Sequence, residues 1–225
     1  MFLEIIHQDD LFIAINKPHG LLVHRTPIAK DATEFALQLL RDQVGYHVYP
    51  AHRIDRKTSG VLLFSKSKAA DSKVQKLFMK HEVEKTYLAI VRGWTLEEQT
   101  IDYPIGEPNK KKEAITHYRC LEQFEIPVPL GKHNTSRYSL LEVKPITGRF
   151  HQIRQHLSHI FHPIIGDRPH GCSKQNRMWK SKYLMTSMML HAQSLKIRFD
   201  ETESIDIQAP ISDEFKRVLN ILNQN

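Results

Sequence analysis

The spacing of apolar and polar residues along the chain predicts short strands and amphipathic helices in irregular alternation. Apolar runs and polar–apolar alternation over four to seven residues are typical of strands. They occur at 3–6, 11–15, 61–64, 86–92, 138–144 and 195–199. The run at 61–64 is apolar throughout, which indicates a buried strand. The segment 138–144 has apolar residues in both phases of the alternation, so we expect it to be buried in part on both faces.

Helical spacing of apolar residues marks four further segments, at 34–44, 68–81, 150–160 and near the C-terminus. Pro163 must lie beyond the end of the third helix, because proline removes a helical donor. The last helix has Ser212 as its N-cap and Asp213 and Glu214 in its first turn. Apolar residues at 215, 218, 219 and 222 supply its buried face.

Strands therefore outnumber helices and do not alternate strictly with them. This order favours an α+β fold with a largely antiparallel mixed sheet flanked by helices and loops, rather than a doubly wound fold. The chain of 225 residues has no internal repeat and no linker rich in Gly, Pro or Ser. One compact domain over residues 1–225 is the simplest arrangement.

The charge of the chain indicates a polyanionic partner. Lys and Arg number 32 against 25 Asp and Glu, which gives a formal net charge of +7. Nucleic acid and an anionic membrane surface both fit such a charge. No apolar stretch reaches the roughly 18 residues of a membrane span. The first 15 residues also lack the pattern of a signal peptide, and the chain has only two cysteines. We therefore expect a cytoplasmic protein in a reducing compartment.

Two segments without clear periodicity gather the cations. One, at 107–113, carries Lys110, Lys111 and Lys112. The other, at 167–182, reads as a loop in which Trp179 stands among five cations. Cations beside an aromatic ring suit a phosphate backbone and a stacked base. Each segment alone is more simply interpreted as a solvated basic loop.

Candidate chemistry is concentrated around Asp55, on a loop that opens onto the buried strand at 61–64. Arg53, Arg56 and Lys57 flank it, and nearby cations keep a carboxylate ionised, as a nucleophile or general base requires. The alternative is a structural salt bridge or a turn cap through Thr58 and Ser59. On composition alone the structural alternative is favoured.

Five motifs in a fixed order change that balance. They are H-R-I-D-R-K-T-S-G at 52–60, K-T-Y at 85–87, T-G-R-F-H-Q-I-R at 147–154, H-P-I-I-G-D at 162–167 and M-L-H-A at 189–192. Together they resemble the RluA-type pseudouridine synthases. The segments at 21–25, 91–94, 102–104 and 116–119, with Arg177 before the strand of Leu190, are similar to the tRNA pseudouridine synthase C group. The resemblance covers most of the chain. It implies a catalytic domain without the N-terminal RNA-binding domain that many relatives carry.

The resemblance also assigns roles. Asp55 is the catalytic carboxylate, and Arg154 pairs with it through its planar fork. Tyr87 stacks on the target uracil and can serve in proton removal from C5. Leu190 forms an apolar wall of the pocket.

A uridine in a helical stem must be flipped out of the duplex before a carboxylate can reach it. His52 and Arg53 are the candidates that fill the gap or hold the flipped base. Arg149 and His151 are interpreted as groups that bind phosphate or position loops. The implied substrate is uridine 65 of the tRNA acceptor stem, and ribosomal RNA is the alternative. The reaction implies no cofactor, no metal and no protein partner, and we expect a monomer.

Three other functions fit parts of the sequence. A metal enzyme is suggested by His151, His156, His159, His162 and Cys172, but their spacing matches no standard zinc pattern. An RNA-binding protein without catalysis would be expected to lack Asp55, Tyr87 or Arg154. A carboxylate hydrolase would need a second carboxylate, and the motif segments offer no obvious one.

Overall fold

The computed structural model describes residues 1–25, 32–201 and 204–224 of the chain. Its backbone contacts divide the chain into two compact units. The first unit comprises Met1–Lys85 and Ala192–Pro210, and the second comprises Thr86–His191 and Ile211–Asn225. The chain passes between them inside strands β5 (Val83–Arg92) and β9 (Leu190–Arg198), and once more between Pro210 and Ile211.

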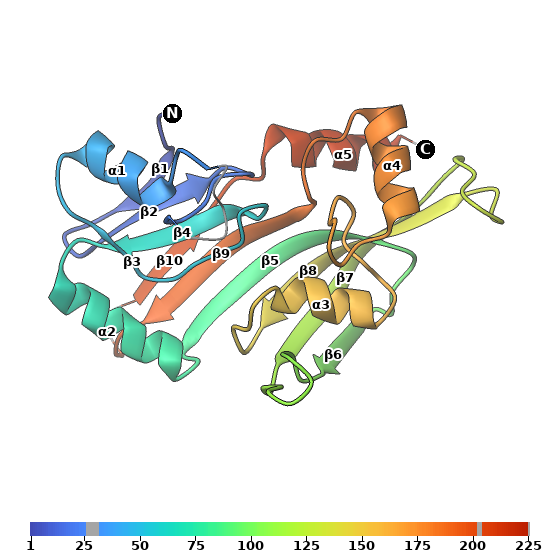
Figure 1. The fold of residues 1–225 in the computed structure, drawn as a ribbon. Coiled ribbons are helices and arrows are strands. Elements are labelled where there is room, and N and C mark those ends of the chain that lie inside the picture. The colour runs from blue at the N-terminus through green and yellow to red at the C-terminus, as the bar shows by residue number, and fades with distance from the viewer. Residues whose placement is uncertain (26–31, 202–203, 225) are drawn as a thin grey trace. The chain divides into compact units, whose positions relative to one another are not determined.

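The first unit is built on a sheet with the strand order β1-β2-β4-β9, in which β2 is antiparallel to both β1 and β4 (Figure 1). β10 pairs with β9, and the short β3 pairs with β4. The strands are β1 (Ile5–Gln8), β2 (Phe12–Lys17), β3 (Tyr49–Pro50), β4 (Ser59–Ser65) and β10 (Ser204–Gln208).

The alternation of apolar side chains along β2 supplies two separate cores, because successive side chains point to opposite faces. Phe12 and Ala14 pack with Ala70 and Val74 of α2 (Lys68–Met79). Ile13 and Ile15 pack with α1 (Ala36–Val44). A helix therefore covers each face of the sheet of this unit (Figure 1).

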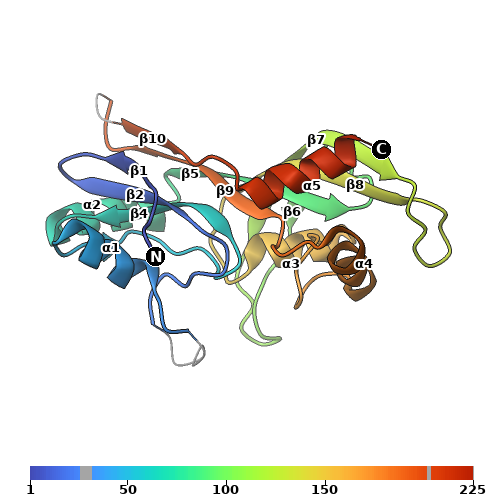
Figure 2. The same ribbon diagram turned by 90° about the horizontal axis from the view of Figure 1, so that it is seen from above.

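The second unit has the strand order β5-β8-β7-β6. β6 (Glu98–Asp102) pairs with β7 (Ile115–Ile126), which pairs with β8 (Ser136–Pro145). Figure 2 shows β7 and β8 running side by side toward the turn that joins them. Helices α3 (Gln152–His159), α4 (Ser173–Tyr183) and α5 (Asp213–Asn223) pack on the core of this unit.

The predicted fold class is confirmed: the chain has an α+β fold in which antiparallel ladders are flanked by helices. The predicted cap of the last helix is confirmed too, since the Ser212 side chain accepts a hydrogen bond from the Phe215 N–H. Tyr138, Ser139, Leu141 and Val143 are all buried, so β8 is partly buried on both faces, as expected. That the whole chain is one catalytic domain stays a prediction.

The prediction of a loop over 167–182 is wrong, because residues 173–183 form α4. Trp179 is fully buried and makes an edge contact with Tyr138, with ring centroids 5.4 Å apart. The phenol of Tyr138 donates to the buried amide of Gln175, one turn earlier on the same helix. Trp179 is therefore a core anchor, and it is not available to stack on a base.

The segment 107–113 is a loop, as predicted. Among the residues that the structure describes, no helix has both the length and the apolar character needed to cross a bilayer.

Candidate active site

Asp55 lies partly exposed on the loop that leads into β4. Its carbonyl accepts the N–H of Thr58 at 3.1 Å. The next residue, Arg56, is tied to Gly20 in both directions. The Gly20 N–H donates to the Arg56 carbonyl at 2.8 Å, and Arg56 Nε donates to the Gly20 carbonyl at 3.0 Å. The loop that carries Asp55 is thus fixed to the turn that follows β2.

Lys17 lies beneath the loop that carries Asp55 and the turn that follows β2. It is fully buried at the end of β2, and its Nζ donates to the carbonyls of Pro18, Leu21 and Arg56 at 2.9, 2.9 and 3.2 Å. Burial lowers the pKa of this ammonium to about 7, and the attraction of the Asp55 carboxylate opposes that shift.

His52 is held by β4 rather than left to move. Its Nε2 accepts the N–H of Leu63 at 3.1 Å, and its ring stacks on Phe78 with centroids 5.4 Å apart. Burial, with a smaller contribution from the charge of Lys85, lowers the pKa of His52 to about 3. The imidazole is therefore neutral at physiological pH. Arg53, the other candidate for filling the gap, is exposed.

The structure explains why the first motif ends with glycine, at Gly60. Its φ is +108°, and a Cβ built there would lie 2.1 Å from the carbonyl oxygen of Ala192. No side chain fits, so the backbones of β4 and β9 can approach closely only with glycine at this position.

In the second unit, Tyr87 lies partly exposed on β5, opposite Val143 of β8. Leu190 begins β9 and is buried against the core of the same unit. An apolar wall is consistent with its environment.

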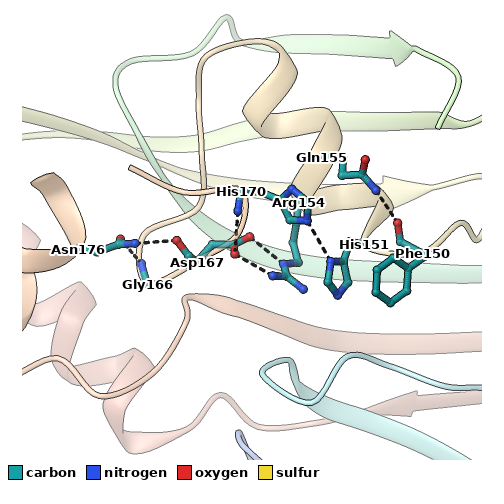
Figure 3. Close-up of polar contacts among 8 residues, drawn as sticks. All are labelled: Phe150, His151, Arg154, Gln155, Gly166, Asp167, His170 and Asn176. Carbon is teal, nitrogen blue, oxygen red and sulfur yellow. Dashed lines mark hydrogen bonds and ion pairs between the residues drawn. The ribbon is translucent and has the colours of Figure 1, made fainter. Parts of the chain in front are cut away.

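Arg154 is buried on α3 and is held by Asp167 (Figure 3). Its Nε donates to Asp167 Oδ2 and its Nη2 to Oδ1, both at 2.7 Å. The two side chains are 5% and 1% exposed. The main chain around Asp167 is fixed in turn by Asn176, which donates to the Asp167 carbonyl and accepts the Gly166 N–H. Sequence reasoning assigned no role to Asp167 or Lys17.

His151 is the N-cap residue of α3 and lies in the left-handed region, with φ of +54°. Its ring stacks on Phe150 at 3.7 Å, and its Nδ1 shares a hydrogen bond of 2.9 Å with Nε2 of His170. Figure 3 shows the two imidazoles beside the pair of Arg154 and Asp167. His151 is therefore placed to position the segment that carries His170.

The buried amide of Gln152 connects the motif at 147–154 to β7. Its Oε1 accepts the hydroxyl of Thr147 and the N–H of Arg149, and its Nε2 donates to the Ile115 carbonyl and the Thr116 hydroxyl. Arg149 Nε donates to the Glu113 carbonyl at 2.9 Å. Arg149 is thus bonded to the loop at 107–113, and its role in binding phosphate or positioning loops stays a prediction.

Comparison with known proteins identifies the family of the chain. The family model described as RNA pseudouridylate synthase matches residues 11–159, about two thirds of the chain. The chain belongs to the RNA pseudouridylate synthase family. The resemblance inferred from the five motifs is confirmed, and the protein is an enzyme of the isomerase class.

Individual relatives agree with this family. The chain is 43% identical to the tRNA pseudouridine synthase C of Vibrio parahaemolyticus, over 96% of this chain and 93% of that protein. It is 43% identical to the protein of the same name from Haemophilus ducreyi, over 98% and 96% of the two chains. Human RNA pseudouridylate synthase domain containing 4 matches with a TM-score of 0.75 and 25% identity, over 98% and 93%.

The residues expected in the active site of this synthase are divided between its two units. His52, Arg53 and Asp55 belong to the first unit, and Tyr87, Arg149, His151, Arg154 and Leu190 belong to the second. The pairing of Arg154 with Asp55 stays a prediction. Among the described residues, no three His, Cys, Asp or Glu side chains are grouped as a metal ion would require.

Proposed function

We propose that the enzyme converts uridine to pseudouridine in tRNA, at position 65, with Asp55 as its catalytic carboxylate. The observation that carries this proposal is the similarity to proteins named tRNA pseudouridine synthase C, which extends over 96% of the chain at 43% identity. A synthase that acts on ribosomal RNA is the second candidate, because the core motifs alone do not select the RNA. We place the reaction in the cytoplasm and expect one chain to act alone.

The chemistry suits the first unit of the chain. Pseudouridine formation breaks the bond between C1′ and N1, turns the uracil and joins C1′ to C5, from which a proton leaves. It is an isomerisation without net oxidation, so it calls for no redox cofactor. A positioned, ionised carboxylate can divide such an exchange into easier steps. The turn held by Lys17 and Arg56 gives Asp55 that fixed position.

Arg154 has one edge of its guanidinium on Asp167. A guanidinium has five N–H donors in a fixed plane, so pairing with Asp55 would use the other edge, formed by Nη1 and Nη2. In this arrangement Asp167 sets the plane of Arg154, and Arg154 orients the catalytic carboxylate.

Access to a uridine in a helical stem requires base flipping. Arg53 is exposed and its flat guanidinium can stack between bases, so we assign the filling of the gap to Arg53. His52 is neutral and held by Leu63, so it positions the loop. Tyr87 would stack on the flipped uracil, and Leu190 would close the pocket.

We assign the binding of RNA phosphates to one face of α4. Lys174, Arg177 and Lys180 follow one another every three residues and are exposed. They extend over about 9 Å at 1.5 Å per residue. Within the described part of the chain they form no ion pairs. The chain has no Asp or Glu between Asp167 and Asp200, so nothing on this helix opposes an approaching phosphate.

The test is the fate of uridines in tRNA and ribosomal RNA from cells with and without the protein, mapped chemically at each position. We expect loss of pseudouridine at tRNA position 65 in its absence. Purified Asp55→Asn enzyme should lose at least about 10³-fold in rate and keep its affinity for tRNA. A lesion confined to ribosomal RNA contradicts the tRNA assignment, and full activity of the Asp55→Asn enzyme contradicts the catalytic role.

A further inference from the structure

A cavity of about 390 Å³ lies in the second unit, where the end of β5 meets the end of α3 and the start of α4. Arg92, Phe161, His170 and Lys174 line it, together with small residues. Its volume is within the range of about 300–1,000 Å³ that is usual for small-ligand sites. No acidic side chain lines it.

The cavity lies away from Tyr87, the residue of this unit that we expect to stack on the reacting uracil. Arg92 and Tyr87 stand five residues apart on β5, which corresponds to about 16 Å along a strand. The main chain of Arg92 is fixed beside the cavity, since its N–H donates to the Pro163 carbonyl and its carbonyl accepts from His162 Nδ1. These hydrogen bonds hold the wall of the cavity in place.

Phe161 is the unusual member of the lining. It is 82% exposed, and its φ is +66°, a region in which a bulky side chain is strained. It follows α3 at the position where helices usually end with glycine. The Phe161 N–H donates to the Ser158 carbonyl, and the next N–H, of His162, donates to the Leu157 carbonyl. The turn therefore calls for glycine, and the chain places an exposed aromatic ring there instead.

An exposed ring, two exposed cations and the absence of acids are the elements of a nucleotide site. Nucleobases stack on aromatic side chains, and their phosphates bind Arg and Lys. We propose that this cavity is a second nucleotide-binding subsite, which takes an unstacked nucleotide of the RNA substrate. Phe161 stacks on the base, and Arg92 and Lys174 bind the phosphate. The proposal rests on the proposed RNA substrate and deepens it, because it gives that RNA a contact remote from the reacting uridine.

The test compares Phe161→Gly with Leu184→Gly in the full chain. Leu184 is also apolar, 74% exposed and left-handed at the end of a helix, with φ of +52°, but it does not line the cavity. Both variants relieve the same backbone strain, so both should unfold at or above the temperature of the wild type. We expect Phe161→Gly to raise the Kd for a tRNA transcript about tenfold and Leu184→Gly to leave it unchanged.

A second variant, Arg92→Gln with Lys174→Gln, removes the cations without changing the turn. It should weaken tRNA binding and reduce the slope of log Kd against log salt by about two. For Phe161→Gly, the rate of pseudouridine formation at saturating enzyme should stay that of the wild type. This readout separates the subsite from the catalytic assignment: a failure of the proposed function removes pseudouridine formation from the wild type itself, whereas the binding comparison does not depend on it.

Free uridine and adenosine 5′-monophosphate serve as probes of the other source of a nucleotide. The proposal is overturned if Phe161→Gly binds tRNA as the wild type does, or if Leu184→Gly weakens binding equally. It is also overturned if free nucleotide binds at micromolar concentration in a manner that depends on Phe161 while tRNA binding is unaffected by the substitution.

Discussion

Asp167 accepts two parallel hydrogen bonds from the guanidinium of Arg154, each 2.7 Å long, in a site where both side chains are almost fully buried. A planar, bidentate pair of this kind fixes the orientation of the arginine as well as its charge. Asp167 is able to do this because the loop at 162–167 turns sharply at Gly166. Its φ is +83°, and a Cβ there would lie 2.6 Å from the Ser187 carbonyl oxygen.

Breaking the pair of Asp167 and Arg154 should destabilise the folded enzyme. Asp167→Asn removes one charge and leaves the buried Arg154 cation uncompensated, so we expect the free energy of unfolding to fall by about 3 kcal/mol. Urea denaturation measures the loss. The matched control is Asp206→Asn, which breaks the exposed pair with Lys196 at 4.0 Å and should cost well under about 1 kcal/mol. Equal effects of the two substitutions would show that the buried pair is not special.

Lys17 gives a prediction with a defined dependence on pH. Its pKa is about 7 in the folded chain because it is buried, and 10.5 is its ordinary value. Between pH 7 and pH 10 the unfolded chain therefore binds a proton that the folded chain lacks, so this residue makes stability rise with pH. Relative to Lys17→Met, the free energy of unfolding of the wild type should increase by roughly 2 kcal/mol from pH 7 to pH 9. Parallel pH curves for the two proteins would exclude this titration.

The substitution should also act on catalysis, because the Arg56 carbonyl loses a donor on the loop that carries Asp55. We expect the rate constant for pseudouridine formation to fall in Lys17→Met while the affinity for tRNA is kept. Lys66→Met, directly after β4, is the control, since Lys66 bonds the Asp9 carbonyl, away from this loop. A rate equal to that of the wild type would show that the hydrogen bond from Lys17 to the Arg56 carbonyl is dispensable for catalysis.

The regular elements were predictable where one face of each is apolar. α5 follows its pattern closely, because helical spacing decides which side chains meet the core. The segment of α4 has few apolar residues and contains Pro169 and Gly171 just before it. Its buried face depends on Gln175 and Trp179 finding Tyr138, and that long-range contact leaves no periodic signal.

The candidate site was predictable to a different extent. Ordered motifs were sufficient to identify the family, and the assignments to Asp55, Tyr87 and Arg154 stay predictions. The contacts of Lys17 with three carbonyls and of Asp167 with Arg154 could not be predicted from the sequence. Whether a charged residue is buried depends on long-range packing, which its residue type does not reveal. The one available signal for Lys17 was its place at the end of an apolar strand, where a solvated lysine would be less expected.

His52 should make the enzyme sensitive to acid. Its pKa is about 3 in the folded chain, against an ordinary value of 6.5, because burial and then Lys85 disfavour its charge. As pH falls below about 6.5, His52 binds a proton in the unfolded chain but stays neutral in the folded chain. The free energy of unfolding therefore falls with falling pH. From pH 7.5 to pH 5.5 we expect this residue to contribute a loss of about 1 kcal/mol.

His52→Gln is the comparison for this titration. Its amide oxygen can accept the Leu63 N–H as His52 Nε2 does, but it does not titrate. The difference in the free energy of unfolding between the wild type and the variant should narrow by about 1 kcal/mol on acidification over that range. A constant difference between the wild type and His52→Gln would contradict a neutral His52.

The exposed face of α4 predicts how RNA affinity responds to salt. Arg177→Gln with Lys180→Gln removes two cations of α4 that do not line the cavity. Removal of each cation that binds a phosphate should reduce the slope of log Kd against log salt by about one, and affinity at low salt should fall for tRNA of any sequence. The charge-matched control is Lys68→Gln with Lys76→Gln on α2, which also removes two exposed lysines. If both pairs change the slope equally, the effect belongs to the net charge of the chain and α4 has no dedicated contact with the RNA.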